Sequence, residues 1–286
     1  PRRTSIAARW ARPATAAVAK SAMALRRLDA ELVRRGLARS RETARELIDS
    51  GAVEVGGLVV TKPASQVNDA ESIRVRPLES NNWVSRGSGK LIGALEAFPE
   101  IVIANKVCLD AGASTGGFTA VLLDRGASKV YAVDVGYGQL AWSLQSDDRV
   151  VVMDRFNVRN LSAADLGELP ELVVSDLSFI SLRTVMPALC SVSTPDADLL
   201  LMVKPQFEVG KERLGKGGVV RSPLLRAEAV TGVAAAAWLQ GFGCAGVAAS
   251  PLPGPSGNVE YFLWLRRDCP PIGEDDVERA VREGPQ

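Results

Sequence analysis

The sequence predicts an α/β protein in which a small basic N-terminal domain precedes a doubly wound, largely parallel sheet. Two observations predict the sheet: apolar runs alternate with helical patterns after residue 88, and the first run leads into a glycine-rich turn. A third observation distinguishes the N-terminal part from the rest of the chain: residues 1–28 contain seven arginines or lysines and no acidic residue. The 286 residues suffice for two domains.

Residues 1–23 precede the first helical pattern and lack the continuous apolar stretch of a secretory signal. We expect a basic, disordered extension here, and an organellar transit peptide is the alternative. Met23 stands directly before the first patterned helix. Residues 1–22 therefore form such an extension or lie upstream of the natural start.

Residues 24–80 predict a small α+β domain. Leu28, Leu32 and Leu37 mark one face of a first helix. A second helix is expected between Ser40, an N-cap residue, and Gly51, a C-cap glycine. Residues 53–60 then predict two short strands around a Gly-Gly turn, and residues 73–75 predict a further strand.

The same domain carries a cluster of arginines, which faces only three acidic residues between positions 26 and 45. Such charge suits phosphate contacts, and a solvated helical face explains it equally well. Residues 27–67 resemble an S4 domain, a small RNA-binding module, most clearly at residues 28–29, 37–41 and 51–55. The resemblance implies contacts to structured RNA by Arg26, Arg27, Arg34, Arg35, Arg39, Arg41 and Arg45.

Residues 81–87 are rich in polar and turn residues and predict a linker, with Trp83 as a packing anchor. The larger domain is expected at residues 88–267, and residues 268–286 predict a polar terminal helix without chemistry. Strand candidates of the larger domain are residues 107–110, 130–134, 150–154, 172–176, 199–204, 246–250 and 259–265. Open α/β sheets bind ligands at the carboxyl ends of such strands.

The first of these strands leads into a turn whose glycines, at positions 112, 116 and 117, do not fit the dinucleotide-binding pattern. Aspartates stand at the ends of three successive strands, which makes a plain tight turn a weaker explanation. The turn resembles the loop that binds S-adenosyl-L-methionine. That resemblance implies cofactor contacts from Asp110, Gly112, Ser114, Thr115, Gly116, Gly117, Phe118, Asp134, Asp154 and Asp176.

Composition excludes several kinds of chemistry. The chain has no histidine, so Ser-His and Cys-His nucleophile pairs and the commonest metal ligand are absent. Four widely spaced cysteines support neither a zinc site nor a disulfide framework. No apolar run approaches the roughly 20 residues that cross a bilayer. We therefore expect a cytoplasmic protein without a metal and without a membrane partner.

The segment after the fourth strand is Asp176-Leu177-Ser178-Phe179. It lacks the Asn/Asp-Pro-Pro-aromatic pattern of base amino methylation, and Cys190 lies too far along for cysteine-dependent carbon methylation. Lys90, Asp176, Lys204 and Glu260 instead resemble the Lys-Asp-Lys-Glu set of FtsJ-type ribose methyltransferases. Singly, each would be a surface charge or a salt bridge.

The resemblance gives these four residues catalytic roles. A ribose hydroxyl must lose its proton as it accepts a methyl group, and Lys204 is the candidate base. Lys90 is expected to be the neighbouring cation that favours neutral Lys204, while Asp176 and Glu260 orient the lysines and the hydroxyl. A basic, glycine-rich loop at residues 210–218 either closes over RNA or is a mobile connection.

Across residues 27–267 the chain is similar to the TlyA family, also called the hemolysin A family, which joins an S4 domain to an FtsJ-like domain. The matching stretches are residues 83–87, 90–91, 110–118, 134–140, 176–181, 203–208 and 250–261. Asn81 and Ser88-Gly89 depart from the Arg and the Ala-His that relatives often carry.

The family resemblance implies a Rossmann-like class I methyltransferase sheet and S-adenosyl-L-methionine as cofactor. It also implies 2′-O-methylation of ribosomal RNA, at cytidine, in the small subunit, the large subunit or both. Two alternatives from other classes are a membrane-active hemolysin, as the older family name suggests, and an RNA-binding protein without catalysis.

Overall fold

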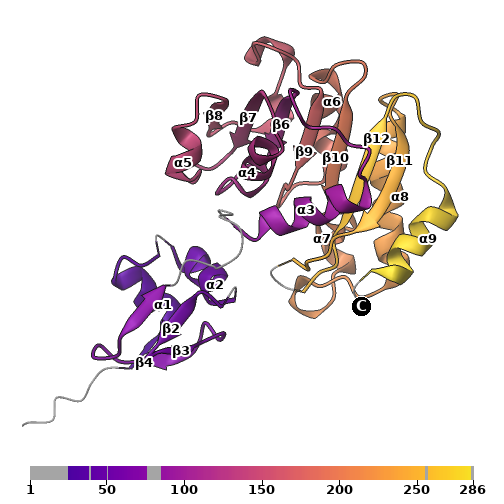
Figure 1. Ribbon diagram of the computed structural model, residues 1–286. Coiled ribbons are helices and arrows are strands. Elements are labelled where there is room, and N and C mark those ends of the chain that lie inside the picture. Colours follow the sequence, from indigo (N-terminus) through magenta and orange to yellow (C-terminus); the bar gives the residue numbers. More distant parts are fainter. Residues whose placement is uncertain (1–24, 39, 50, 76–84, 255–256, 285–286) are drawn as a thin grey trace, which may run out of the picture. The chain divides into compact units, whose positions relative to one another are not determined.

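The computed structural model describes residues 25–38, 40–49, 51–75, 85–254 and 257–284 (Figure 1). The chain divides into two compact units, residues 1–80 and 81–286. The predicted extension at residues 1–23 lies outside the described residues, as do Arg39 and most of the predicted linker with Trp83 and Asn81.

The N-terminal unit contains two helices on a small sheet. The helices are α1 (Leu28–Arg34) and α2 (Arg41–Asp49), and the strands β2 (Val53–Val55), β3 (Leu58–Val59) and β5 (Ile73–Val75) pair in the order β3-β2-β5. A separate two-stranded sheet pairs β1 (Arg26–Arg27) with β4 (Gln66–Val67). Apolar side chains on both helices and on β2 form the core, with Leu28, Leu32, Ala44, Ile48 and Val53 all fully buried.

The larger unit is built on a seven-stranded sheet with the strand order β11-β12-β10-β9-β6-β7-β8. Its strands are β6 (Val107–Ala111), β7 (Lys129–Asp134), β8 (Val150–Asp154), β9 (Leu172–Ser175), β10 (Asp198–Val203), β11 (Gly243–Ala249) and β12 (Tyr261–Arg266). β12 runs antiparallel to both of its neighbours, β10 and β11, and all the other strand pairs of this sheet are parallel. The predicted doubly wound sheet is confirmed, and its strand order reverses between β6 and β9, where such sheets bind ligands.

Helices cover both faces of this sheet (Figure 1). Helices α3 (Gly87–Ala97) and α4 (Gly117–Asp124) pack on one face, and α6 (Leu182–Ser191), α8 (Pro223–Trp238) and α9 (Glu274–Glu283) pack on the other. Two short helices, α5 (Trp142–Gln145) and α7 (Pro205–Glu208), follow β7 and β10. Short 3-10 turns occupy Val158–Asn160, Ala163–Asp165, Lys211–Arg213 and Lys216–Gly218.

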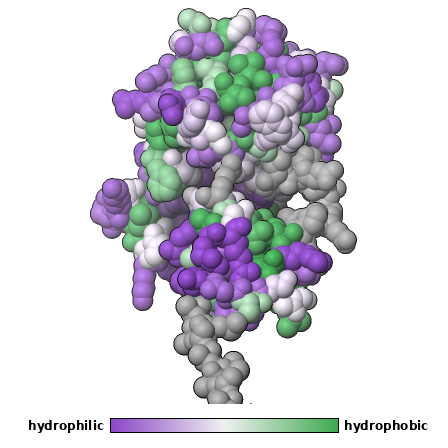
Figure 2. Space-filling model, turned by 90° about the vertical axis from the view of Figure 1, so that its left-hand side faces the viewer, coloured by the Kyte–Doolittle hydropathy of each residue, from purple (hydrophilic) through white to green (hydrophobic). Residues whose placement is uncertain are grey.

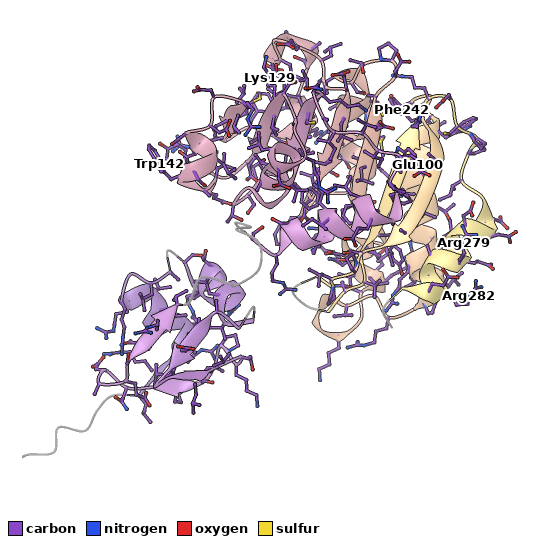
Figure 3. All side chains as sticks on the ribbon, viewed as in Figure 1. Glu100, Lys129, Trp142, Phe242, Arg279 and Arg282 are labelled. Atoms are coloured by element: carbon purple, nitrogen blue, oxygen red, sulfur yellow. The ribbon has the colours of Figure 1, made fainter. Side chains whose placement is uncertain are left out.

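Helix α9 belongs to the core of the larger unit. Val277, Ala280 and Val281 are buried in the cluster that covers the α6 and α8 face of the sheet. Figure 3 shows Arg279 and Arg282 on the outer side of the same helix. The terminal helix expected at residues 268–286 therefore has an apolar face that helps to hold the sheet. Within the described residues, no helix is both long and apolar enough to cross a membrane.

Candidate active site at the carboxyl ends of the strands

Strand alternation brings the predicted reactive residues to one face of the sheet. On β10, Leu200 and Met202 pack with α3 and α4, whereas Leu199, Leu201 and Val203 pack on the opposite face. Side chains two positions apart share a face. Three predicted residues continue the alternation just past the paired strand positions on the α3 and α4 face: Asp176 after β9, Lys204 after β10 and Glu260 before β12.

Lys204 is held at the end of β10 by two side chains from the neighbouring loop. Its Nζ lies 2.6 Å from Asp176 Oδ1 and donates a hydrogen bond of 2.8 Å to Ser178 Oγ. The Lys204 side chain is 8% exposed, and that of Asp176 is 22% exposed. The ammonium is thus nearly enclosed, while its carboxylate partner still reaches solvent.

Lys90 comes from α3, the helix that covers the same face, and its partner is Glu260. Lys90 Nζ donates a hydrogen bond of 2.5 Å to Glu260 Oε2, and both side chains are buried. The same nitrogen lies 4.0 Å from Met202 Sδ, two residues before Lys204. Glu260 Oε1 has no hydrogen-bond partner among the described residues.

The four residues thus meet as two separate ion pairs, Lys90–Glu260 and Lys204–Asp176. The sequence predicted Lys90 as the neighbouring cation of Lys204, with Asp176 and Glu260 orienting the two lysines. In the structure each lysine has its own carboxylate, and the four charges balance. Val203 of β10 pairs with Tyr261 of β12 in antiparallel register. Lys204 comes directly after Val203 and Glu260 directly before Tyr261, so these two residues, one from each ion pair, are neighbours on adjacent strands.

Asp110 lies beneath the glycine-rich turn. Its side chain is fully buried, and Oδ2 accepts hydrogen bonds from Thr119 N at 2.8 Å and Thr119 Oγ1 at 2.7 Å. Burial, with smaller effects of Asp176 and Asp134, raises the pKa of this carboxyl to about 7. Asp110 therefore fastens the start of α4 to β6.

The turn's glycines are required by the protein's own packing. Gly112 has a φ of +92°, and a Cβ there would lie 2.8 Å from the backbone oxygen of Asp176. Gly116 has a φ of +96°, and a Cβ there would lie 2.2 Å from Leu144 Cδ1 in α5. Both positions combine a left-handed backbone with a close approach, which only glycine accommodates.

The predicted cofactor residues divide by exposure. Asp110, Gly116, Gly117 and Phe118 are buried, and Phe118 stacks on Phe262 with ring centroids 6.2 Å apart. Parts of the turn that remain accessible are Gly112, Ser114 and Thr115. A ligand at this turn would thus meet the backbone of residues 112–115 and the carboxylates that end β7 and β8.

Asp134 and Asp154 pair with each other in the β7–β8 register, and backbone amides fix both carboxylates. Asp134 accepts hydrogen bonds from Ser114 N at 2.8 Å and Gly136 N at 2.7 Å, and Asp154 accepts one from Gly138 N at 2.7 Å. Both aspartates are half-buried. Each carboxylate oxygen can accept more than one hydrogen bond, so these groups suit ribose hydroxyls and a positively charged cofactor.

Sequence reasoning assigned no role to Ser178 or Phe179. Ser178 binds Lys204, and Phe179 is 92% exposed with a φ of +64°, a rare backbone conformation for a bulky residue. The Phe179 ring lies 5.3 Å from that of Phe207. Ser178 and Phe179 lie two and three residues after Asp176, just past the end of the buried strand β9. This position was the feature of the sequence that could have indicated a role for them.

The cysteines offer no nucleophile at this site. All four are free, and burial raises the pKa of the Cys108 and Cys190 thiols to about 12. Both thiols therefore stay protonated at neutral pH. Among the residues that the structure describes, no group of three or more His, Cys, Asp or Glu side chains could hold a metal ion.

In the N-terminal unit the arginines surround two buried carboxylates. Asp29 is fully buried and lies 3.0 Å from Arg27, 2.9 Å from Arg41 and 3.5 Å from Arg45. Arg27, followed by Arg41, lowers the pKa of Asp29 despite its burial. This cluster joins β1, α1 and α2, so three of the predicted RNA-binding arginines also have a structural partner.

Glu31 forms the second cluster. Arg34 and Arg35 lie 2.5 Å and 2.7 Å from its carboxylate, and Arg34, followed by Arg35, lowers the pKa of Glu31 to about 2. Arg26 and Arg34 also contact Asp69, at 2.8 Å and 2.7 Å. Figure 2 shows a strongly hydrophilic area on this unit, and its arginines outnumber the acids that they contact.

Comparisons with known proteins agree with this division. Residues 83–267 match the family of FtsJ-like methyltransferases, and residues 26–73 match the S4 domain. The chain is 59% identical over 264 residues to the 16S/23S rRNA (cytidine-2′-O)-methyltransferase TlyA of Mycobacterium tuberculosis, covering 91% of this chain and 98% of that protein.

Two further similar proteins carry the name hemolysin. Hemolysin A of Brachyspira hyodysenteriae is 38% identical over 237 residues, which are 82% of this chain and 98% of that protein. A solved structure from Streptococcus thermophilus, also named as a hemolysin, is 36% identical with a TM-score of 0.73. It covers 92% of this chain and 96% of its own.

Proposed function

The chain belongs to the TlyA family, in which an S4 domain precedes an FtsJ-like methyltransferase domain, and we propose that it methylates ribose 2′-hydroxyls of ribosomal RNA. One observation carries the proposal: the Lys90–Glu260 and Lys204–Asp176 ion pairs lie together past the strand ends, on one face of the sheet. The M. tuberculosis relative supports cytidine in the small and large subunits as the target.

S-adenosyl-L-methionine would supply the methyl group, carried on a positively charged sulfur that becomes a neutral thioether. The donor set fits this cofactor. The turn of backbone amides follows β6, where the strand order reverses, and the half-buried Asp134 and Asp154 end the next two strands, β7 and β8. Asp134 and Asp154 would hold hydroxyl and amino groups of the cofactor. Asp176, the partly exposed member of its ion pair, would face the positive charge.

The chain's own residues would accept the proton that the ribose 2′-hydroxyl loses. The ribose 2′-oxygen gains a methyl group while its proton passes to Lys204 Nζ, which Asp176 and Ser178 hold in place. Lys90, fixed by Glu260, contributes positive charge where the oxygen becomes more negative. Lys204 accepts this proton as a neutral amine. The set that results, two ammonium groups and two carboxylates, buries no net charge.

The N-terminal unit would bind RNA through the charge that its ion pairs leave over. Six described arginines there contact Asp29, Glu31 and Asp69, and five of their side chains are 41–55% exposed. Exposed guanidinium groups can donate further hydrogen bonds to phosphates. Ribosomal subunits as substrates would place this activity in the cytoplasm.

The test is to incubate the protein with methyl-labelled S-adenosyl-L-methionine and ribosomal subunits that lack the modification, followed by nucleoside analysis. Lys204→Ala is the test variant, and Lys129→Ala is the matched control, because Lys129 pairs with Glu168 at the start of β7, away from the site. We expect 2′-O-methylcytidine from the wild type and the control alone.

Three results would contradict the proposal. Label on a base would assign a different reaction, and full activity in Lys204→Ala would remove the assigned base. A protein that binds no S-adenosyl-L-methionine but lyses red cells would support the hemolysin alternative instead.

A further inference from the structure

A buried carboxylate outside the two reactive ion pairs connects the loops that carry them. Glu208 ends helix α7, four residues after Lys204, and is 6% exposed. It lies in neither the cofactor turn nor the reactive set. Burial of a carboxylate is unfavourable unless it is paired and hydrogen-bonded, so its partners indicate what it holds.

Glu208 is fully engaged with the first turn of α6. Oε1 accepts a hydrogen bond of 2.7 Å from Leu182 N, and Oε2 accepts hydrogen bonds of 2.5 Å from Ser181 Oγ and 3.2 Å from Arg183 Nε. Arg183 Nη2 also donates to the backbone oxygen of Glu208 at 2.7 Å. A carboxylate 26 residues away thus completes the cap of α6.

These contacts fix the far end of the loop that binds Lys204. The segment between β9 and α6 starts with Asp176, passes through Ser178 and ends at Ser181. Its first half is bound to Lys204, and its second half is bound to Glu208. Two bridges, one at each end of a short segment, therefore tie this loop to the β10–α7 segment.

We propose that Glu208 is a positioning residue for methyl transfer, which sets the placement of Asp176 and Ser178 against Lys204. This inference rests on the proposed function. The bridge contains no reacting group, but the loop between its ends includes Phe179 in a left-handed backbone conformation. Such a conformation persists only when the surrounding structure holds it. Loss of the Glu208 bridge would free the loop to relax and would move Asp176 and Ser178.

If Glu208 only stabilised the fold, its loss would lower stability without a specific loss of rate. Asp198, a buried carboxylate far from the reactive residues, provides the control for that case. Asp198 is also 6% exposed and also accepts hydrogen bonds at both carboxylate oxygens, from Lys106 Nζ at 3.0 Å and from Trp264 Nε1 at 2.8 Å. It begins β10, at the opposite end of the strand from Lys204. Asp198→Asn should therefore lower stability without displacing the reactive residues.

The experiment compares Glu208→Gln, Glu208→Ala and Asp198→Asn with the wild type. Thermal unfolding, the Kd for S-adenosyl-L-methionine, and single-turnover methylation over a range of ribosomal subunit concentrations are measured for each. We expect Glu208→Ala to lose about 100-fold and Glu208→Gln about tenfold in the rate at saturating RNA, because small displacements of reacting groups are costly. Gln keeps an acceptor for Leu182 N, which explains the partial rescue.

A positioning residue should affect the rate at saturating RNA but not the affinity for cofactor or RNA, whereas a general loss of folded structure should affect both. The Kd for the cofactor and the RNA concentration at half-maximal rate should stay within about threefold of the wild type, and Asp198→Asn should keep its rate. If Glu208→Ala fails to fold, Glu208→Gln and Arg183→Gln carry the test, since the Arg183 side chain is 51% exposed.

Two outcomes overturn the inference: folded Glu208 variants with the wild-type rate, or an equal loss of rate in Asp198→Asn. A wild type that transfers no methyl group would instead remove the proposed function, and the two failures are therefore distinguishable.

Discussion

The N-terminal unit and the sheet of the larger unit both bury carboxylates, but they balance the charge differently. Asp29 and Glu31 each face two or three arginines, most of them half exposed. Asp176 and Glu260 each face one nearly buried lysine. The first arrangement leaves a positive surplus at the surface, which suits a polyanion. The second leaves none and suits a proton transfer in a confined site.

The largest expected effect is that of Lys204→Ala on the rate. Removing a general base costs about 10²–10⁴-fold, so the variant should lose nearly all methyl transfer at saturating RNA. Cofactor affinity should change far less, because the turn and the two strand-end aspartates are untouched. Isothermal titration and single-turnover assays measure the two quantities. Loss of cofactor binding as large as the loss of rate would contradict the division of roles.

The second prediction concerns the stability of the Lys90–Glu260 pair. Glu260→Gln leaves the Lys90 ammonium buried without a charged partner, and breaking such a pair costs about 3–5 kcal/mol. Adding Lys90→Met should recover much of this loss, because neither of these two positions then buries a charge. Urea unfolding of the single and double variants measures both changes. Neither variant should regain methylation, and a double variant with wild-type activity would show that the pair is structural.

The third prediction concerns pH and Asp110. The folded carboxyl has a raised pKa of about 7, whereas the unfolded one titrates near 3.8. Between these values the folded state holds a proton that the unfolded state has lost, so this group's contribution to stability falls as pH rises. The total decrease is up to about 4 kcal/mol. Above pH 7 the decrease is complete.

Asp110→Asn removes that titration and keeps an acceptor for the Thr119 amide. The stability of the variant relative to the wild type should therefore rise between about pH 4 and pH 7 and then level off. Chemical denaturation at a series of pH values measures the difference, in which other groups cancel. A difference that does not vary with pH would show that Asp110 is ionised in the fold.

The smallest effects are expected from the arginines of the N-terminal unit. Arg41 and Arg45 have side chains 54% and 55% exposed, whereas Arg35 is 21% exposed and also donates to backbone oxygens at positions 68, 69 and 71. Arg41→Ala or Arg45→Ala should weaken RNA binding severalfold and reduce its salt dependence by about one phosphate contact.

Arg35→Ala is the matched variant for this prediction, and it should lower stability more than RNA affinity. Binding titrations at several salt concentrations, together with thermal unfolding, distinguish the two classes. Equal effects of Arg35→Ala and Arg41→Ala on the salt slope would contradict the proposed surplus of charge.

Sequence alone predicted the elements that local pattern determines. The apolar runs already placed Asp176, Lys204 and Glu260 at strand ends, and the family resemblance added Lys90 and the catalytic roles. Pairing was not predictable in the same way, because Lys90 and Glu260 are 170 residues apart and only the fold joins them. The number of arginines in the N-terminal domain predicted a basic surface but did not show which carboxylates they contact. Asp29 and Glu31, which lie among these arginines in the sequence, are their partners.

Other differences have the same origin. A Cβ at Gly116 would clash with Leu144, 28 positions later. The sequence pattern indicated that this glycine makes room for a ligand, but the glycine also makes room for a side chain of the protein itself. Asp110 was predicted to end its strand, but β6 continues to Ala111 and Asp110 is fully buried. The Glu208 bridge spans 26 residues and has no local pattern. Long-range contacts of this kind become visible only in three dimensions.

The most direct test of the contrast between the two units is single-turnover methylation of ribosomal subunits by Lys204→Ala and Arg41→Ala. We predict that Lys204→Ala stays slow at every RNA concentration, whereas Arg41→Ala reaches the wild-type rate once RNA is raised. The reverse pattern, a Lys204→Ala rate restored by RNA or an Arg41→Ala rate that stays low at saturation, would contradict it.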